Sequence, residues 1–229
     1  MLTRSAGVAA VVAGAIFIGV QLNHPPLTVA GVHPAEWAIR SSLKMLMATL
    51  ALVGITGMYL YQVKKMGVLG LLGYVLFAAN YLFIASTSFV AAIILPAIAD
   101  TSPTYVTNVL VAASGHHPAG YTGSLYTVIL FGGFLYLAGG LIFGIALYRA
   151  RVLPRWAAAL LAVGGLASAG LTLLPDPWFR LLAVPNGIAM IALGYSLWRI
   201  GGAESADITE TATRASDVPN ARVADVGVQ

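Results

Sequence analysis

The sequence predicts an all-α fold: a polytopic transmembrane bundle of six helices arranged as three hairpins. Three observations predict it. Of the 229 residues 59% are apolar and 9% are charged, the mean hydropathy is +0.87, and long intervals carry no charge. Soluble domains have about a quarter of their residues charged. The composition therefore argues against a cytosolic enzyme, a disordered chain and a nucleic-acid binder, and we expect no nucleic-acid partner.

The charge-free intervals predict the helices in order, because a bilayer core about 30 Å thick requires roughly 20 apolar residues per helix. The interval 66–99 exceeds one span, so its helix should tilt or protrude. The interval 101–148 is too long for one helix, and Ser102-Pro103 and the Gly/His/Pro break at 115–118 predict a short interfacial helix and a loop before the fourth span. The predicted spans are 5–22, 42–62, 67–98, 125–147, 156–174 and 181–198.

Lysine and arginine counts predict the orientation, since cytoplasmic loops carry the excess of these residues. With both termini on one side, seven basic residues of the first 200 lie on that side and three on the other. The seven are Arg4, Lys64, Lys65, Arg149, Arg151, Arg155 and Arg199, and the three are Arg40, Lys44 and Arg180. We therefore expect a multi-pass protein of a bacterial plasma membrane with both termini in the cytoplasm.

The chain divides into a membrane domain, residues 1–200, and a tail, residues 201–229. The membrane domain has a net charge of +7, whereas the tail has five acids and two arginines and few large apolar residues. Such a composition predicts a disordered acidic cytoplasmic tail. Within the membrane domain, small residues four apart, such as Ala15 and Gly19 or Gly140 and Gly144, predict close contacts between helices.

Charged side chains at a membrane are costly, so each is a functional hypothesis. Glu36, Arg40 and Lys44 follow at i, i+4 and i+8, which we interpret as one face of the second helix, and Asp176 and Arg180 repeat the four-residue spacing at the sixth. Glu36 and Asp176 are the candidate catalytic acids. A structural interpretation stays open, because Asp176 before a proline fits a helix N-cap and Glu36 suits the helix dipole.

The candidate substrate-binding residues are the cations that could grip a polar head group, the amides within the bundle, and aromatic side chains that could stabilise a developing cation. Packing and inter-helix hydrogen bonds are the alternative roles of the aromatic and amide groups. The set is Arg40, Lys44, Arg180, Asn80, Asn186, Trp37, Trp178, Tyr81 and Tyr126.

We expect no metal and no cofactor, because nucleotide-binding, serine-hydrolase, HExxH and diphosphate motifs are all missing and the chain has no cysteine. A weaker alternative is a metal site built from the histidines, since zinc binds where three or four such ligands converge. Prolines follow His24 and His33 directly and interrupt a regular helical face. The histidines are His24, His33, His116 and His117.

Three stretches carry a family resemblance: LTRSAGVAAVVAGAIFIGVQLNHPP, GITGMYLYQVKKMGVLGLLGYVLF and RARVLPRWAAALLAVGG. They resemble small multi-pass membrane proteins of actinobacteria, which implies the fold and the location and no activity. In size, helical architecture and scarcity of acids the chain is also similar to the small integral-membrane terpene cyclases. In that family an acid protonates an isoprenoid within an apolar bundle.

Two function hypotheses follow. In the first, the protein binds, or converts by acid catalysis of the cyclisation type, an apolar isoprenoid or lipid-like substrate in the outer half of the bundle. A carboxyl group desolvated in an apolar pocket can remain a proton donor. In the alternative, the protein is a non-catalytic membrane accessory or sensor that acts through its outer loops or its tail. The lipid bilayer is a partner in both, and a lipid-like small molecule only in the first.

Overall fold

Helices make up 84% of the described chain, which contains no strand. The computed structural model describes residues 1–22, 25–167 and 183–216, with the backbone alone for 204–216. Helices long and apolar enough to cross a membrane are Leu2–Gly19, Ala35–Tyr61, Val63–Ile98 and Leu125–Ala150. The predicted all-helical fold with membrane-compatible helices is thus confirmed for these residues.

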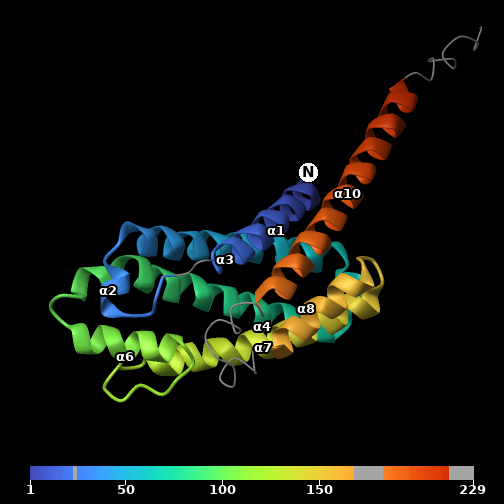
Figure 1. Cartoon of the computed structure of the whole chain (residues 1–229). Coiled ribbons are helices and arrows are strands. Elements are labelled where there is room, and N and C mark those ends of the chain that lie inside the picture. The colour runs from blue at the N-terminus through green and yellow to red at the C-terminus, as the bar shows by residue number, and fades with distance from the viewer. Residues whose placement is uncertain (23–24, 168–182, 217–229) are drawn as a thin grey trace, which may run out of the picture.

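The elements follow the expected order, and Figure 1 shows their arrangement. They are α1 (Leu2–Gly19), α2 (Val29–Val32), α3 (Ala35–Tyr61), α4 (Val63–Phe89), the π-helix η1 (Val90–Ile94), α5 (Leu95–Ile98), α6 (Pro103–Ala113), α7 (Leu125–Ala150), α8 (Arg155–Ala167) and α10 (Ala183–Ser216). Helices α8 and α10 cover parts of the fifth and sixth expected spans, and residues 168–182 between them lie outside the described residues.

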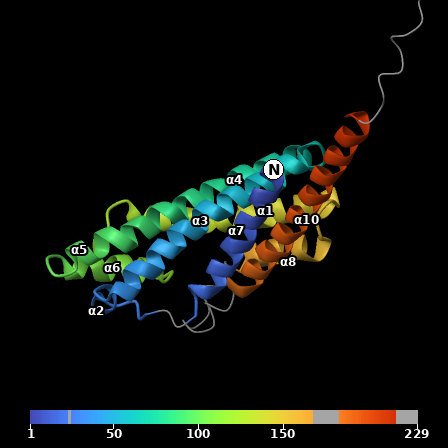
Figure 2. The same ribbon diagram turned by 90° about the horizontal axis from the view of Figure 1, so that it is seen from above.

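The long helices pack side by side in chain order: α1 on α3, α3 on α4, α4 on α7, α7 on α8 and α8 on α10. Helix α10 returns to pack along the whole of α1, and Figure 2 shows these two helices together. The guanidinium of Arg4 lies 5.5 Å from the ring centroid of Trp198, and that of Arg155 lies 4.0 Å from the ring of Tyr148. The start of α1 thus lies beside the late part of α10, and the start of α8 beside the end of α7.

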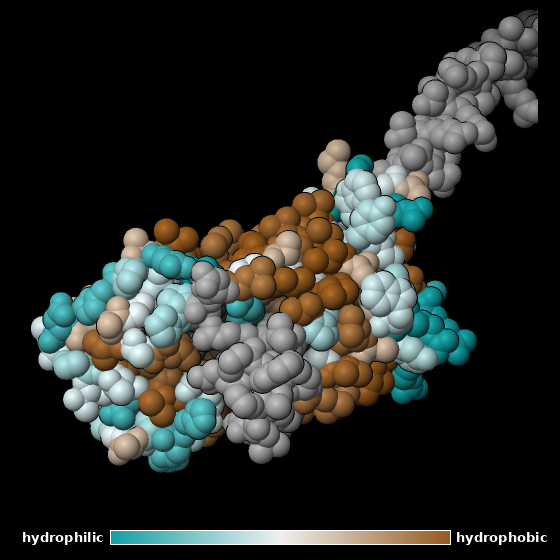
Figure 3. All heavy atoms as spheres, in the orientation of Figure 1, coloured by the Kyte–Doolittle hydropathy of each residue, from teal (hydrophilic) through white to brown (hydrophobic). Residues whose placement is uncertain are grey.

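Because consecutive helices run in opposite directions, the seven basic residues expected on one side lie at one end of the bundle, which we call the basic end. Figure 3 shows a broad hydrophobic band over the middle of the molecule with more polar residues at the two ends. Exposed apolar side chains of α3, α4 and α7 include Val53, Leu72, Val75 and Phe134. This distribution is what a surface in contact with lipid requires.

Glycines allow α1 and α10 to approach closely. A Cβ atom at Gly14 would lie 2.5 Å from the carbonyl oxygen of Gly187, and one at Gly7 would lie 2.7 Å from that of Gly194. The expected contact at Ala15 and Gly19 is not formed, since both residues are exposed and nothing lies within 4 Å of a Cβ atom at Gly19. The two glycines of α1 that contact α10, Gly7 and Gly14, are instead seven residues apart. This spacing corresponds to two helical turns, because α1 packs along α10 over that length.

Helix α6 packs against the bundle, because Val106, Val109 and Leu110 are buried in a hydrophobic cluster at the end of the bundle opposite the basic end. Helix α10 continues to Ser216, so the backbone of 201–216 is helical. Alanine, which has the highest helix propensity, is the most frequent residue in this segment.

Candidate functional site

A cavity of about 290 Å³ lies at the end of the bundle opposite the basic end. Helices α3, α4, α6 and α7 and the π-helix η1 surround it. Its polar lining residues are Gln21, Ser41, Lys44, Thr87 and Ser88, and its apolar lining includes Trp37, Ile84, Leu95, Val109, Leu110 and Ile129. The size is close to the lower limit of ligand pockets, which are about 300–1,000 Å³.

Helix α3 presents Trp37, Ser41 and Lys44 to this cavity. The three residues follow at i, i+4 and i+7, which places them within a narrow sector of one helix face. Trp37 and Ser41 are each 4% exposed, whereas Lys44 is half-buried. Lys44 thus lies two helical turns from the buried indole of Trp37. The rest of the cavity wall is apolar or carries hydroxyl groups and the amide of Gln21.

The expectation that Glu36, Arg40 and Lys44 share one face is wrong. Successive residues of an α-helix are rotated by about 100°, so a step of eight residues rotates the side chain by about 80°. Lys44 is instead within about 20° of Trp37, seven residues earlier. Glu36 and Arg40 lie on the sector that borders α1, where they line a separate groove with Ile39.

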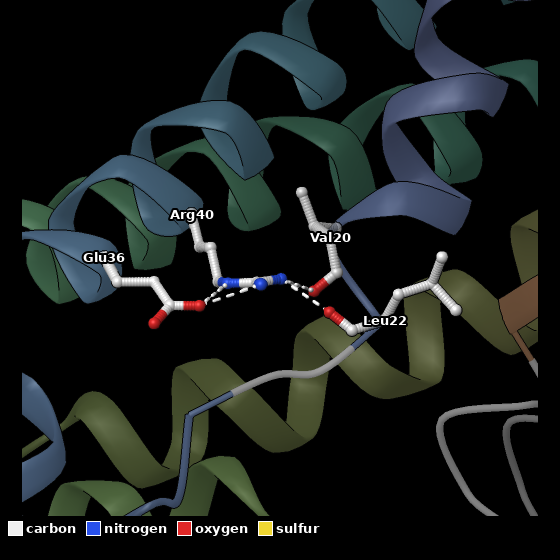
Figure 4. A network of polar contacts seen from close by, with 4 residues as sticks. All are labelled: Val20, Leu22, Glu36 and Arg40. Carbon is white, nitrogen blue, oxygen red and sulfur yellow. Dashed lines mark hydrogen bonds and ion pairs between the residues drawn. The ribbon is translucent and has the colours of Figure 1, made fainter.

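Arg40 binds the end of α1 (Figure 4). Its Nη1 donates hydrogen bonds to the carbonyl oxygens of Leu22, at 2.7 Å, and Val20, at 3.4 Å, while its Nε donates to Glu36 Oε1 at 2.9 Å. The last carbonyls of a helix lack intrahelical donors, and a cation there is also favoured by the helix dipole. Arg40 therefore fastens α1 to α3, and Glu36, with its side chain 53% exposed, holds the guanidinium.

Pro96 determines the backbone hydrogen bonding of the cavity wall at η1. The Leu95 N–H donates to the Val90 carbonyl five residues back, so it does not reach the carbonyl of Ala91 as an α-helix would require. The next residue in the π-helical register is Pro96, which has no N–H. The Ala91 carbonyl has thus lost both of its helical donors, and Trp37 Nε1 donates to it at 2.8 Å.

Helix α6 closes the cavity from the side of the loops. Val109 and Leu110 on α6 pack in one cluster with Trp37, Leu95 and Val32. Asn108, on the same helix, accepts a hydrogen bond at its Oδ1 from the Gly120 N–H at 3.1 Å, which fixes the loop that leads back to α7. The lid over the cavity is therefore a packed part of the fold.

The amides expected within the bundle lie deeper than this cavity. Asn80 is 1% exposed and Asn186 is 3% exposed. Asn186 Nδ2 donates a hydrogen bond to the Tyr136 hydroxyl, which ties α10 to α7. Tyr81 is also buried, with its ring centroid 4.8 Å from that of Phe77. None of these residues is among the described lining of the cavity.

The three histidines that the structure describes do not form a cluster of metal ligands. His33 Nε2 lies 3.6 Å from Asp100 Oδ1, and His116 Nδ1 lies 3.1 Å from the Ser114 hydroxyl. The ring of His117 contacts that of Tyr126, with centroids 5.1 Å apart. In the part of the chain that the structure describes, no three histidines or carboxylates come together as metal ligands.

Four of the candidate residues lie outside the described residues: His24, Asp176, Trp178 and Arg180. Of the other candidates, the structure brings Trp37 and Lys44 to the cavity. Sequence reasoning missed Ser41, Thr87 and Ser88, although the run Ser86-Thr87-Ser88 interrupts an otherwise apolar stretch and could have indicated them.

The chemistry of the cavity is that of recognition. An ammonium group, hydroxyls and an amide can donate hydrogen bonds to an anionic or carbonyl-bearing head group, and the apolar wall can hold a hydrocarbon body. No carboxylate is among the described lining residues. No protein-family model, curated protein or solved structure matches the chain, so the site rests on the chain's own residues.

Proposed function

We propose that the protein is a multi-pass protein of a bacterial plasma membrane that binds a lipid-like molecule with an anionic head group in the cavity between α3, α6 and α7. The observation that carries this proposal is the lining, in which Lys44, the hydroxyls of Ser41, Thr87 and Ser88 and the amide of Gln21 stand among mainly apolar side chains. We place both termini in the cytoplasm and the cavity in the outer half of a six-helix bundle, because the seven basic residues gather at the opposite end.

Lys44 is the residue on which binding depends most in this proposal. Charged side chains close to the hydrocarbon region of membrane proteins are rare and commonly serve binding or transport. The hydroxyls of Ser41 and Ser88 add donors for the remaining oxygens of a carboxylate or phosphate, whereas the Thr87 hydroxyl donates to the Phe83 carbonyl. The apolar side chains of Leu95, Leu110 and Ile129 would contact the hydrocarbon part of the ligand.

Binding is better supported than acid-catalysed conversion. A general acid must reach the substrate directly or through one water. Glu36 is bound to Arg40 on the sector of α3 that borders α1, and is not among the cavity's lining residues. We therefore assign Glu36 and Arg40 a structural role.

A photoactivatable decanoic acid and its methyl ester test the proposal on the full-length protein in detergent. The acid should label peptides that line the cavity and bind more tightly than the ester. Lys44→Met should weaken acid binding about tenfold, as loss of a hydrogen bond to a charged group predicts, and should leave the ester unaffected. Ala113→Trp, at the exposed rim of the cavity, should block both probes.

Lys64→Met is the matched control, because this exposed lysine lies at the basic end. Its binding of the acid should equal that of the parent protein. Equal labelling by acid and ester, or labelling spread over all lipid-facing helices, would reject the cavity as an anion-selective site.

The accessory hypothesis is supported by one observation, the continuation of α10 to Ser216 beyond the bundle (Figure 1). A helix that projects from the proposed cytoplasmic end offers a surface to a partner. A photo-crosslinking amino acid at position 212, with position 203 as control, tests this in growing cells. A single adduct specific to position 212 would support the second function, and identical patterns at both positions would remove it.

A further inference from the structure

A second groove lies at the basic end, between the start of α8 and the late part of α10, and has a volume of about 490 Å³. Tyr195, Ser196 and Arg199 line it from α10, and Trp156 lines it from α8. The two aromatic side chains are 59% exposed at Trp156 and 52% exposed at Tyr195. The cavity near α6 and this groove are at opposite ends of the bundle, so neither depends on the other.

The α10 side of the groove is one continuous face. Ala192, Tyr195, Arg199 and Ala203 follow at spacings of three or four residues, which aligns their side chains along the helix. Ala192 and Tyr195 lie toward the middle of the bundle, Arg199 lies toward its basic end, and Ala203 follows one turn beyond Arg199. From the middle of the bundle toward Arg199, the face therefore changes from apolar to cationic. A phospholipid in the same orientation changes from acyl chain to phosphate.

The groove is cationic by several independent contributions. Arg199 is exposed and makes no hydrogen bond or ion pair with any residue that the structure describes. Arg4 and Arg155 lie at the same end of the bundle but outside the lining of the groove, with their guanidinium groups over the rings of Trp198 and Tyr148. The first turn of α8 adds the positive end of a helix dipole.

Trp156 and Tyr195 have the chemistry of the membrane interface, where amphipathic rings lie at the level of the head groups. Basic pockets between helices at this level bind anionic lipid head groups. We propose that the groove between α8 and α10 binds one anionic phospholipid, with its phosphate on Arg199 and its glycerol and upper acyl region against Trp156 and Tyr195. The preference over a zwitterionic lipid comes from the positive charge of Arg199.

Native mass spectrometry of the full-length protein in detergent tests this proposal by titration with phosphatidylglycerol and with phosphatidylcholine. The first phosphatidylglycerol should bind about tenfold more tightly than phosphatidylcholine, as a charge-assisted contact predicts. Arg199→Gln should remove this preference, and Arg199→Lys should keep part of it, because lysine keeps the charge and loses the planar fork. Trp156→Ala should weaken both lipids.

Lys65→Ala is the control, since this exposed cation lies at the same end and does not line the groove. It should leave the preference within twofold of the parent protein. Equal binding of the two lipids by the parent protein, or an equal loss in Lys65→Ala and Arg199→Gln, would overturn the site and leave only a general attraction of the basic end. Arg199, Trp156 and Lys65 are all exposed, and a melting curve for each variant checks that it folds.

Discussion

The hydrogen bond from Trp37 to the Ala91 carbonyl should be worth more than an ordinary contact between helices, because that carbonyl has no other helical donor. The Leu95 N–H donates to the Val90 carbonyl, and Pro96 has no N–H that could donate to the Ala91 carbonyl. Replacing Trp37 by phenylalanine keeps an aromatic ring and removes the N–H. Hydrogen bonds between membrane helices average about 0.6 kcal/mol, with a maximum near 1.7. An unsatisfied buried acceptor costs about 1–3 kcal/mol. We expect Trp37→Phe to lower the free energy of unfolding by about 1.5 kcal/mol.

A double-mutant cycle with Pro96→Ala tests directly whether the proline makes the hydrogen bond from Trp37 necessary. Alanine restores an N–H at position 96, which gives the Ala91 carbonyl a donor in the π-helical register. Trp37→Phe should therefore cost about 1 kcal/mol less in the Pro96→Ala background than in the parent protein. Reversible unfolding in mixed detergent micelles measures all four proteins. A cost of Trp37→Phe that is equal in both backgrounds, within about 0.5 kcal/mol, would refute the link between the proline and the indole.

Two further predictions compare neighbouring positions in the same unfolding assay. Gly14→Val should destabilise the protein by at least about 2 kcal/mol, because a Cβ atom there would lie 2.5 Å from the Gly187 carbonyl oxygen, whereas Gly19→Ala, with nothing within 4 Å, should be nearly neutral. Similar costs at the two positions would contradict the close packing of α1 on α10. Arg40→Met should cost about 1–2 kcal/mol by removing the donors at the end of α1, and Glu36→Gln less than about 1 kcal/mol, because its ion pair is exposed. A larger effect of Glu36→Gln on ligand binding than on unfolding would instead show that Glu36 takes part in binding.

The sequence predicted several local features that the structure also contains. The Ser102-Pro103 pair indicated the start of α6, and the long interval before it predicted an extended third helix, observed as Val63–Ile98. The π-helix η1 is also tied to a neighbouring residue, since it ends two residues before Pro96, which has no N–H to donate. These features depend on neighbouring residues along the chain, so they can be inferred without tertiary contacts.

The site was less predictable, because charge alone did not show where each side chain points. Glu36 and Lys44 were assigned to one face on their spacing, yet one borders α1 and the other lines the cavity. Ser41 was overlooked because a single serine in an apolar helix is common. Its role depends on α6 covering that sector, whereas the sequence predicted α6 only as a short interfacial helix.

What the sequence determined by itself was the helical class, the apolar intervals and the distribution of basic residues, since each follows from composition along the chain. The tertiary structure decided the rotation of each helix about its axis. A helix that is apolar on nearly all sides has no periodic pattern to show which sector packs inward. That choice came from contacts such as the glycines between α1 and α10 and the bond from Trp37 to Ala91, which join residues far apart in the chain.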